Sequence, residues 1–185
     1  MNSRPSLQTP ASRYNGLAIF LHWLLALAIV GAFCMGLYMS DLPLSPTRLK
    51  LYNWHKWAGV TILALSALRL LWRLANKPPA DLPMPAWQAR AAHLVHGLLY
   101  LSFFAIPLSG WAYSSAAGFP IVWFGVLPLP DFVPVDKALA HQLKELHELL
   151  AWGLALLVGA HVAAAVKHQL IDKDGLLQRM LPGRG

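Results

Sequence analysis

Cysteine is almost absent from this sequence, and that scarcity removes two kinds of site. Cys34 is the one cysteine of the 185-residue chain, so no internal disulfide can form. A cysteine-based zinc or iron–sulfur centre is excluded as well, because such centres need several thiolates. We interpret Cys34 as a small buried apolar residue.

Charged residues are also scarce. They make up 12% of the chain, whereas 57% of the residues are apolar. A soluble domain of this size needs far more charge to cover its surface, so the composition favours an integral membrane protein. The 15 Lys and Arg residues outnumber the 8 acidic residues. They lie scattered at the ends of apolar runs without a basic–aromatic stripe, so we expect a lipid bilayer and no nucleic acid as their partner.

Four long apolar runs predict the fold class. They cover about residues 16–39, 54–74, 92–113 and 146–171. Each has roughly 20 residues or more, enough for a helix to cross a hydrocarbon core of ~30 Å. We therefore predict an all-α, integral membrane four-helix bundle formed by one domain, residues 1–185. The first run is too long for a cleaved signal peptide.

The segment at residues 118–134 is apolar but carries four prolines. Proline interrupts helices, so this segment is not a fifth span. We expect it to lie on or dip into one membrane interface, with Trp123 and Phe124 facing the lipid headgroups.

Loop charge predicts the orientation, because cytoplasmic loops are enriched in Lys and Arg. The richer side carries Arg4, Arg13, Arg69, Arg73, Lys77, Arg90, Lys167, Lys173, Arg179 and Arg184. The other side carries Arg48, Lys50, Lys56, Lys137 and Lys144. Both termini are therefore expected in the cytoplasm, and the proline-rich segment on the opposite, periplasmic side.

Histidines are unusually placed. The chain has eight: His22, His55, His93, His96, His141, His147, His161 and His168. Seven lie within or at the edges of the apolar runs, where an ionisable group is costly and indicates function. For any single one, the alternative interpretation is an interfacial or helix-bonded side chain.

Spacing and depth arrange four of these histidines in two pairs. His147 and His161 are fourteen residues apart, which places them roughly 21 Å apart along one helix and within about 40° of the same face. His22 begins the first run at the depth of His161, because the first and fourth helices are antiparallel. His55 begins the second run at the depth of His147. We therefore predict the pairs His22–His161 and His55–His147.

Two imidazoles at each depth favour haem over a bare metal ion. Zinc usually takes three or four protein ligands at one point, and no buried carboxylate completes such a set here. Two axial imidazoles leave room for a macrocycle, so the pattern predicts two haems and electron transfer. Arg69, fourteen residues after His55, is a candidate partner for a haem propionate; the alternative is an arginine that extends to the interface. Gly59, Gly110, Gly153 and Gly159 suit the close approach of a flat ring or, equally, of a neighbouring helix.

The sequence resembles the bacterial cytochrome b561 family of four-helix dihaem membrane proteins. The resemblance rests on blocks spread along most of the chain: Ile19-Phe20-Leu21-His22-Trp23, His55-Lys56-Trp57-Ala58-Gly59, Arg69-Leu70-Leu71-Trp72-Arg73, His93-Leu94-Val95-His96, Pro107-Leu108-Ser109-Gly110, Leu146-His147-Glu148 and Gly159-Ala160-His161. It implies two haems b in a bacterial inner membrane, with His22, His55, His147 and His161 as axial ligands. It further implies electron exchange with ubiquinone and, as one activity, oxidation of periplasmic superoxide.

The resemblance also suggests roles at the cytoplasmic side. His168, seven residues after His161, could hydrogen-bond a quinone carbonyl; the alternative is an interfacial histidine beside Lys167. His93 and His96 are candidates for contacts with propionates or quinone, and His141 is interpreted as a surface residue.

At the outer side, three lysines could steer an anion such as superoxide, but nearby acids largely cancel their field. The lysines are Lys56, Lys137 and Lys144, and the acids are Asp131, Asp136, Glu145 and Glu148. Two other functions stay open: a haem b electron-carrier subunit that serves a dehydrogenase or a soluble cytochrome, and a metal-ion transporter. The spans contain almost no acidic or amide side chain to line an ion path, which argues against the transporter.

Overall fold

Four long helices dominate the computed structural model, which describes residues 13–183; Arg4 and Arg184 lie outside the described residues. The helices are α1 (Gly16–Ser40), α2 (Pro46–Ala75), α3 (Ala86–Ala116) and α4 (Lys137–Lys167). Two short strands, β1 (Val122–Trp123) and β2 (Leu127–Pro128), form a hairpin between α3 and α4. A π-helical turn, η1 (His168–Asp172), and a 3-10 turn, η2 (Leu177–Arg179), follow α4. Each long helix is apolar enough over sufficient length to cross a membrane, so the predicted fold class is confirmed.

Polar caps set the beginnings of three helices. The side chains of Asn15, Ser45 and Asp136 accept hydrogen bonds from backbone amides in the first turns of α1, α2 and α4. Because Asp136 caps α4, that helix begins at Lys137, well before the apolar run at residue 146. The added turns carry Lys137, Lys144 and Glu145.

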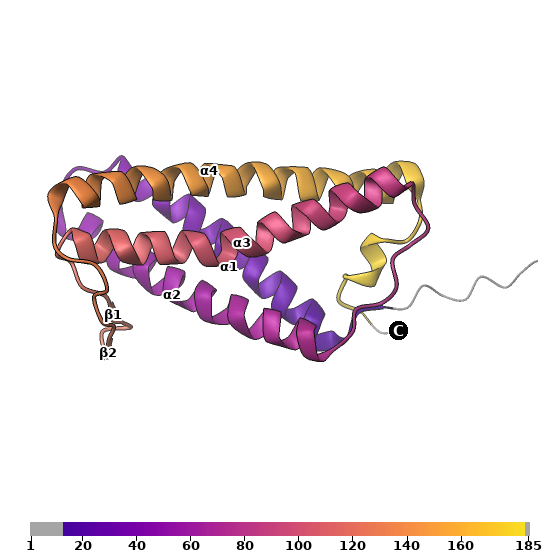
Figure 1. Cartoon of the computed structure of the whole chain (residues 1–185), viewed down its shortest axis with the longest axis horizontal. Coiled ribbons are helices and arrows are strands. Elements are labelled where there is room, and N and C mark those ends of the chain that lie inside the picture. Colours follow the sequence, from indigo (N-terminus) through magenta and orange to yellow (C-terminus); the bar gives the residue numbers. More distant parts are fainter. Residues whose placement is uncertain (1–12, 184–185) are drawn as a thin grey trace, which may run out of the picture.

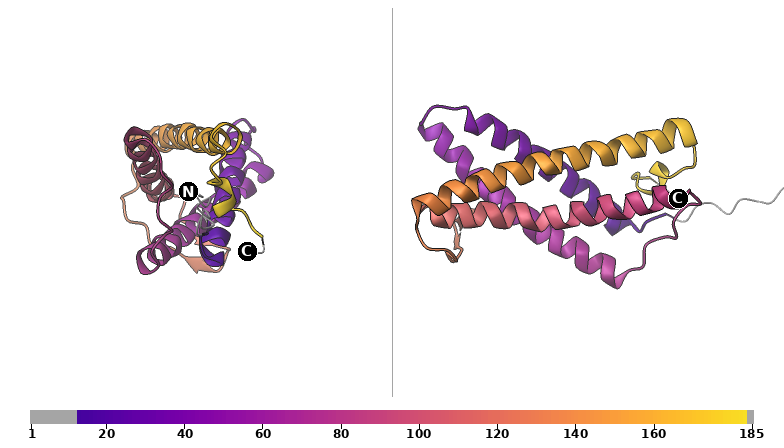
Figure 2. Two further views of the ribbon diagram at one scale, coloured as in Figure 1. Left: turned by 90° about the vertical axis from the view of Figure 1, so that its right-hand side faces the viewer. Right: turned by 45° about the horizontal axis from the view of Figure 1, so that its top comes forward.

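The helices run up and down beside one another, and both ends of the described chain lie at the same end of the bundle (Figure 1). We call this the terminal end, and the opposite one, which carries β1 and β2, the hairpin end. Helix α3 packs along α4, α1 along α2, and α2 against α3. The pairs α1–α4 and α2–α4 approach less closely, and the four helices surround the bundle axis when viewed from the terminal end (Figure 2).

Few side chains are buried, and many large apolar ones are exposed on the helices. This is the surface that a bilayer covers, because lipid tails are as apolar as leucine. Cys34 is exposed on α1, so the prediction of a buried cysteine was wrong. The reason is that α1 is apolar on all sides, and its sequence does not reveal which side faces its neighbours.

The hairpin is attached to the flank of α2. The indole of Trp57 donates to the Val122 carbonyl at 2.6 Å, and that of Trp123 donates to the Thr61 hydroxyl at 3.3 Å. Positive φ angles at Phe124 (51°) and Gly125 (73°) form the turn. Phe124 is exposed, as expected for a residue at an interface, whereas Trp123 is half-buried and anchors the hairpin to α2.

Candidate functional site

The structure brings together both predicted histidine pairs. At the terminal end, the ring centroids of His22 (α1) and His161 (α4) are 6.2 Å apart. At the hairpin end, those of His55 (α2) and His147 (α4) are 6.1 Å apart. Helix α4 thus contributes one histidine to each end, and the fourteen residues between them correspond to roughly 21 Å.

These separations suit two imidazoles on opposite sides of one iron. A metal–nitrogen bond of about 2 Å on each side, with each ring centre about 1 Å beyond its nitrogen, separates two centroids by about 6 Å. The pairs also join α1 to α4 and α2 to α4, which pack less closely than α3 on α4 or α1 on α2. The residues therefore fit a haem at each end, and their assignment as ligands stays a prediction.

The hydrogen bonds of His147 leave one ring nitrogen available. Its Nδ1 lies 3.1 Å from the Ile106 carbonyl and 3.1 Å from the Ser109 hydroxyl, and that hydroxyl donates to the same carbonyl at 2.8 Å. A carbonyl oxygen only accepts, so Nδ1 carries the proton and Nε2 is the nitrogen that can bind metal. Both partners lie beside Pro107, where α3 carries its internal proline.

Two glycines provide the space in which the hairpin-end rings lie. A Cβ on Gly110 would lie 3.0 Å from the His147 ring, and one on Gly36 would lie 3.3 Å from the His55 ring. Gly36 was not among the glycines singled out from the sequence, although it follows His22 by fourteen residues and so shares its face at the depth of His55. An added Cβ on Gly59, Gly153 or Gly159 meets nothing within 4 Å, so neighbouring helices do not pack on these glycines.

The Nδ1 of His55 is buried and makes no hydrogen bond within residues 13–183, although the ring lies near the backbone of Ala32. The contact with the Ala32 backbone assigns the proton to Nδ1 and leaves Nε2 as the nitrogen that can bind a metal, as in His147.

A third histidine and an arginine lie at the terminal end. The ring of His96 (α3) is 5.4 Å from that of His161. Arg69 donates to the Tyr100 hydroxyl at 3.3 Å, and no carboxylate of the described chain lies within salt-bridge distance of it. An uncompensated guanidinium beside this histidine pair suits a haem carboxylate, as the sequence suggested.

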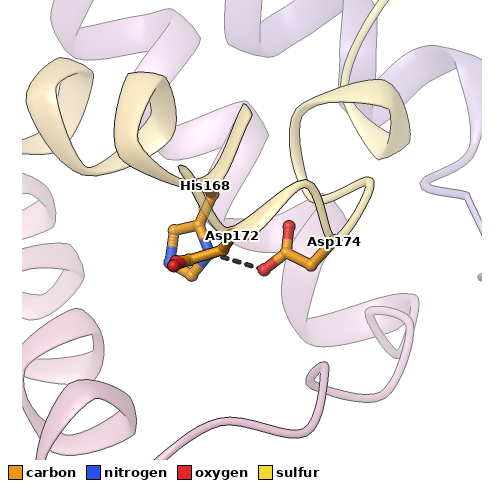
Figure 3. Close-up of side chains that lie close together, drawn as sticks. All are labelled: His168, Asp172 and Asp174. Carbon is orange, nitrogen blue, oxygen red and sulfur yellow. Dashed lines mark hydrogen bonds and ion pairs between the residues drawn. The ribbon is translucent and has the colours of Figure 1, made fainter. Parts of the chain in front are cut away.

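His168 lies apart from the pairs, in a cluster with two aspartates that the sequence did not predict (Figure 3). Its Nδ1 is 2.6 Å from Oδ2 of Asp174 and 3.2 Å from Oδ2 of Asp172, which also binds Lys167. Positive φ angles at Lys173 and Gly175 turn the chain back and bring Asp174 to the ring. Partial burial opposes the charge of Asp174, but hydrogen bonds from the Leu176 amide and from His168 hold the pKa of Asp174 below its usual value.

The remaining predicted residues lie at the surface. His93 forms an exposed pair with Asp81 at 3.4 Å, and His141 an exposed pair with Glu145 at 3.7 Å. Neither joins a histidine pair of the bundle.

Only some of the hairpin-end lysines can act on an anion. Lys144 is paired with Glu148 at 2.9 Å, which cancels its charge locally. Lys56, which follows His55, donates to the Phe119 carbonyl at 2.9 Å. This acceptor is neutral, but Asp131 lies close enough to offset part of the lysine's charge. Lys56 is nevertheless the lysine that adjoins a histidine of this pair in sequence, so it is the candidate for attracting an anion toward the pair.

Comparison with known proteins places this arrangement in a family. Residues 13–183 match the family model described as prokaryotic cytochrome b561. Among curated relatives, cytochrome b561 homolog 2 of Escherichia coli (strain K12) is 37% identical, with 95% of each chain covered. Cytochrome b561 homolog 1 of the same strain is 33% identical over 94% of this chain and 99% of its own. The probable superoxide oxidase CybB of Yersinia pestis is 32% identical over 92% of this chain and 96% of its own.

The match covers the whole described part of the chain, including all four long helices and both histidine pairs. The chain belongs to the prokaryotic cytochrome b561 family, and it is a multi-pass membrane electron-transfer protein of the b-type haem class.

Proposed function

We propose that the protein is a superoxide:ubiquinone oxidoreductase that takes electrons from superoxide at the hairpin end and delivers them to ubiquinone at the terminal end. One observation carries the proposal: two histidine pairs lie at opposite ends of the same bundle and share α4. The relative from Yersinia pestis, described as a probable superoxide oxidase, supports the choice of donor. Superoxide loses one electron to become O₂, and two such electrons with two protons convert quinone to quinol.

We assign the four histidines of the pairs as the residues that would hold two haems b, one pair for each. A b-type haem supplies a one-electron carrier when it is bound. His147 is oriented by the Ile106 carbonyl, which fixes the proton on Nδ1 and directs Nε2 toward the ligand position. Arg69 is placed to pair with a haem propionate at the terminal end.

The proposed orientation places both termini in the cytoplasm and the hairpin end in the periplasm of a bacterial inner membrane. It follows from the excess of Lys and Arg at the terminal end. Superoxide is charged and crosses membranes poorly. A site that accepts electrons at the periplasmic side is therefore accessible to superoxide produced in the periplasm. Lys56 supplies the local positive charge for its approach.

At the terminal end we propose that His168 contacts ubiquinone. Its Nδ1 donates to Asp174, which leaves Nε2 to meet a quinone carbonyl. A histidine held by a carboxylate in this way keeps one orientation and can pass a proton to a reduced carbonyl oxygen.

Stopped-flow mixing of the oxidised, purified protein with superoxide tests the proposal, with haem absorption as the signal. We expect rapid reduction, followed by reoxidation only when ubiquinone is present. Haem that stays oxidised in excess superoxide would contradict the choice of donor.

That outcome would favour the second candidate, an electron-carrier subunit for a dehydrogenase or soluble cytochrome. Exposed apolar side chains on and beside the hairpin give such a partner a surface; Phe124 is 57% exposed and Val126 83%.

A further inference from the structure

A cationic pocket opens at the terminal end, on the side of the bundle formed by α1, α2 and α3. Its volume is about 310 Å³. Its lining includes four cationic side chains, Arg13, Arg69, Arg73 and Lys77, together with Trp72 and Tyr100. No acidic residue is among the described residues that line it.

The charges of these side chains are not neutralised within residues 13–183. Arg13 donates to the main-chain carbonyls of Leu181 and Gly183, and Arg69 to the Tyr100 hydroxyl. Arg73 lies over the Tyr100 ring, 5.7 Å from its centroid. These partners are all neutral, and no described carboxylate lies within salt-bridge distance of the four cations. Like charges gathered in one pocket repel one another, and a bound anion offsets that repulsion.

The pocket lies at the depth of lipid headgroups. Arg73 is in the last turn of α2, which ends at Ala75, and Lys77 follows just beyond it. Trp72 and Tyr100 have the amphipathic rings that favour the boundary between hydrocarbon and water. Basic pockets between membrane helices are a known means of holding anionic headgroups.

The lining cations lie at different distances from the helix ends along the chain. Ala18 precedes His22 by one helical turn, and Arg69, the proposed partner of a haem propionate, lines the same pocket. Arg13, Arg73 and Lys77 lie nearer the helix ends, and we call these three the rim. Within the rim, Arg73 shares the Tyr100 side chain with Arg69 and is close enough to His96 to interact with it electrostatically, whereas Lys77 lies beyond the end of α2.

We propose that the rim binds a phosphate group. Arginine and lysine side chains are the groups that proteins use for phosphate, and the depth matches that of a phospholipid. The phosphate of an anionic membrane lipid and free inorganic phosphate share this chemistry. The site is independent of the electron donor and acceptor, and it would persist if the proposed superoxide activity proved wrong.

The test uses the full chain, purified with its haems in a neutral detergent. Dihexanoyl phosphatidylglycerol below its micelle concentration, or inorganic phosphate at the same ionic strength, is titrated in and binding is measured by calorimetry. The rim variant carries Arg73→Gln and Lys77→Gln. The matched control is Arg90→Gln, which removes an exposed cation from the same end of the bundle outside the pocket.

We expect the rim variant to bind about 30-fold more weakly, roughly fivefold for each cation removed, and the control to bind as the wild type does. Binding of the lipid alone identifies a headgroup site, and equal binding of both probes identifies a free-phosphate site. The single change Lys77→Gln alters an exposed position outside α2 and therefore does not disturb a helix. We expect this variant to bind the anion roughly fivefold more weakly than the wild type.

Two results would overturn the proposal. One is wild-type protein that binds neither probe, or a rim variant that binds them with wild-type affinity. The other is loss of terminal-end haem absorption together with anion binding in the rim variant and in Lys77→Gln alone, because the rim would then serve the haem carboxylates.

Discussion

Replacing Gly110 by alanine should weaken haem binding at the hairpin end alone. The added Cβ would lie 3.0 Å from Cε1 and 3.2 Å from Nδ1 of His147. Ordinary contacts between such atoms begin near 3.5 Å, so the ring must retreat from α3 by about 0.5 Å. Ile106 is also on α3, so that retreat stretches the 3.1 Å contact between Nδ1 and the Ile106 carbonyl to about 3.6 Å, beyond hydrogen-bond length.

Loss of a hydrogen bond that orients a ligand typically costs about 10–100-fold in metal affinity. We therefore expect Gly110→Ala to lose the hairpin-end haem on dilution or to shift its midpoint potential, with the terminal-end haem unchanged. Haem content per chain and a redox titration measure this. Gly97→Ala is the matched control, because Gly97 is exposed on the same helix and an added Cβ there meets nothing within 4 Å. If Gly110→Ala kept both haems with unchanged potentials, the structural role of His147 argued here would be refuted.

Two further changes separate the ends of the proposed electron path. Asp174→Asn should slow quinone-dependent reoxidation about tenfold while leaving reduction by superoxide unchanged, because it releases His168; Asp81→Asn, in an exposed pair at the same end, should change neither. The pKa of Asp174 is lowered, so its contact with His168 is complete at neutral pH and is lost only as the pH falls through that lowered value; wild-type reoxidation should therefore keep this contribution at a pH of about 5. Lys56→Gln should slow reduction by superoxide roughly two- to tenfold at low salt and have no effect near 1 M salt, whereas Lys50→Gln should have little effect at either. A quinone step unaffected by Asp174→Asn, or an equal effect of both lysine changes, would contradict these roles.

Much of the fold was predictable because its signals are local. Four apolar runs of sufficient length indicate four membrane spans. Because successive spans cross the membrane in opposite directions, the position of a histidine along its span gives its depth in the membrane. Because α4 carries His147 and His161 on one face, its partners had to lie at matching depths on other helices, and the structure brings His22 and His55 to those positions. Gly36 follows His22 by fourteen residues on α1, so the same spacing also predicts that Gly36 lies on the inward face at the depth of His55.

Lateral packing was not predictable in the same way. Because α1 and α3 have almost no polar face, periodicity does not reveal that α3 lies along α4 while α1 lies along α2. The attachment of Trp123 to Thr61 and of Asp174 to His168 depends on turns whose left-handed residues reverse the chain. Such contacts follow from the conformation of loops, which hydropathy does not determine.

The central claim is that two haems are held by two histidine pairs, one at each end of the bundle. Single replacement of His55, His147, His22 and His161 by alanine, followed by haem counting and redox titration of each variant, tests it most directly. The account predicts that the His55 and His147 variants lose the same haem and keep the other at its wild-type potential, while the His22 and His161 variants show the converse. Loss of different haems by His55→Ala and His147→Ala, or loss of the same haem by His147→Ala and His161→Ala, would contradict it.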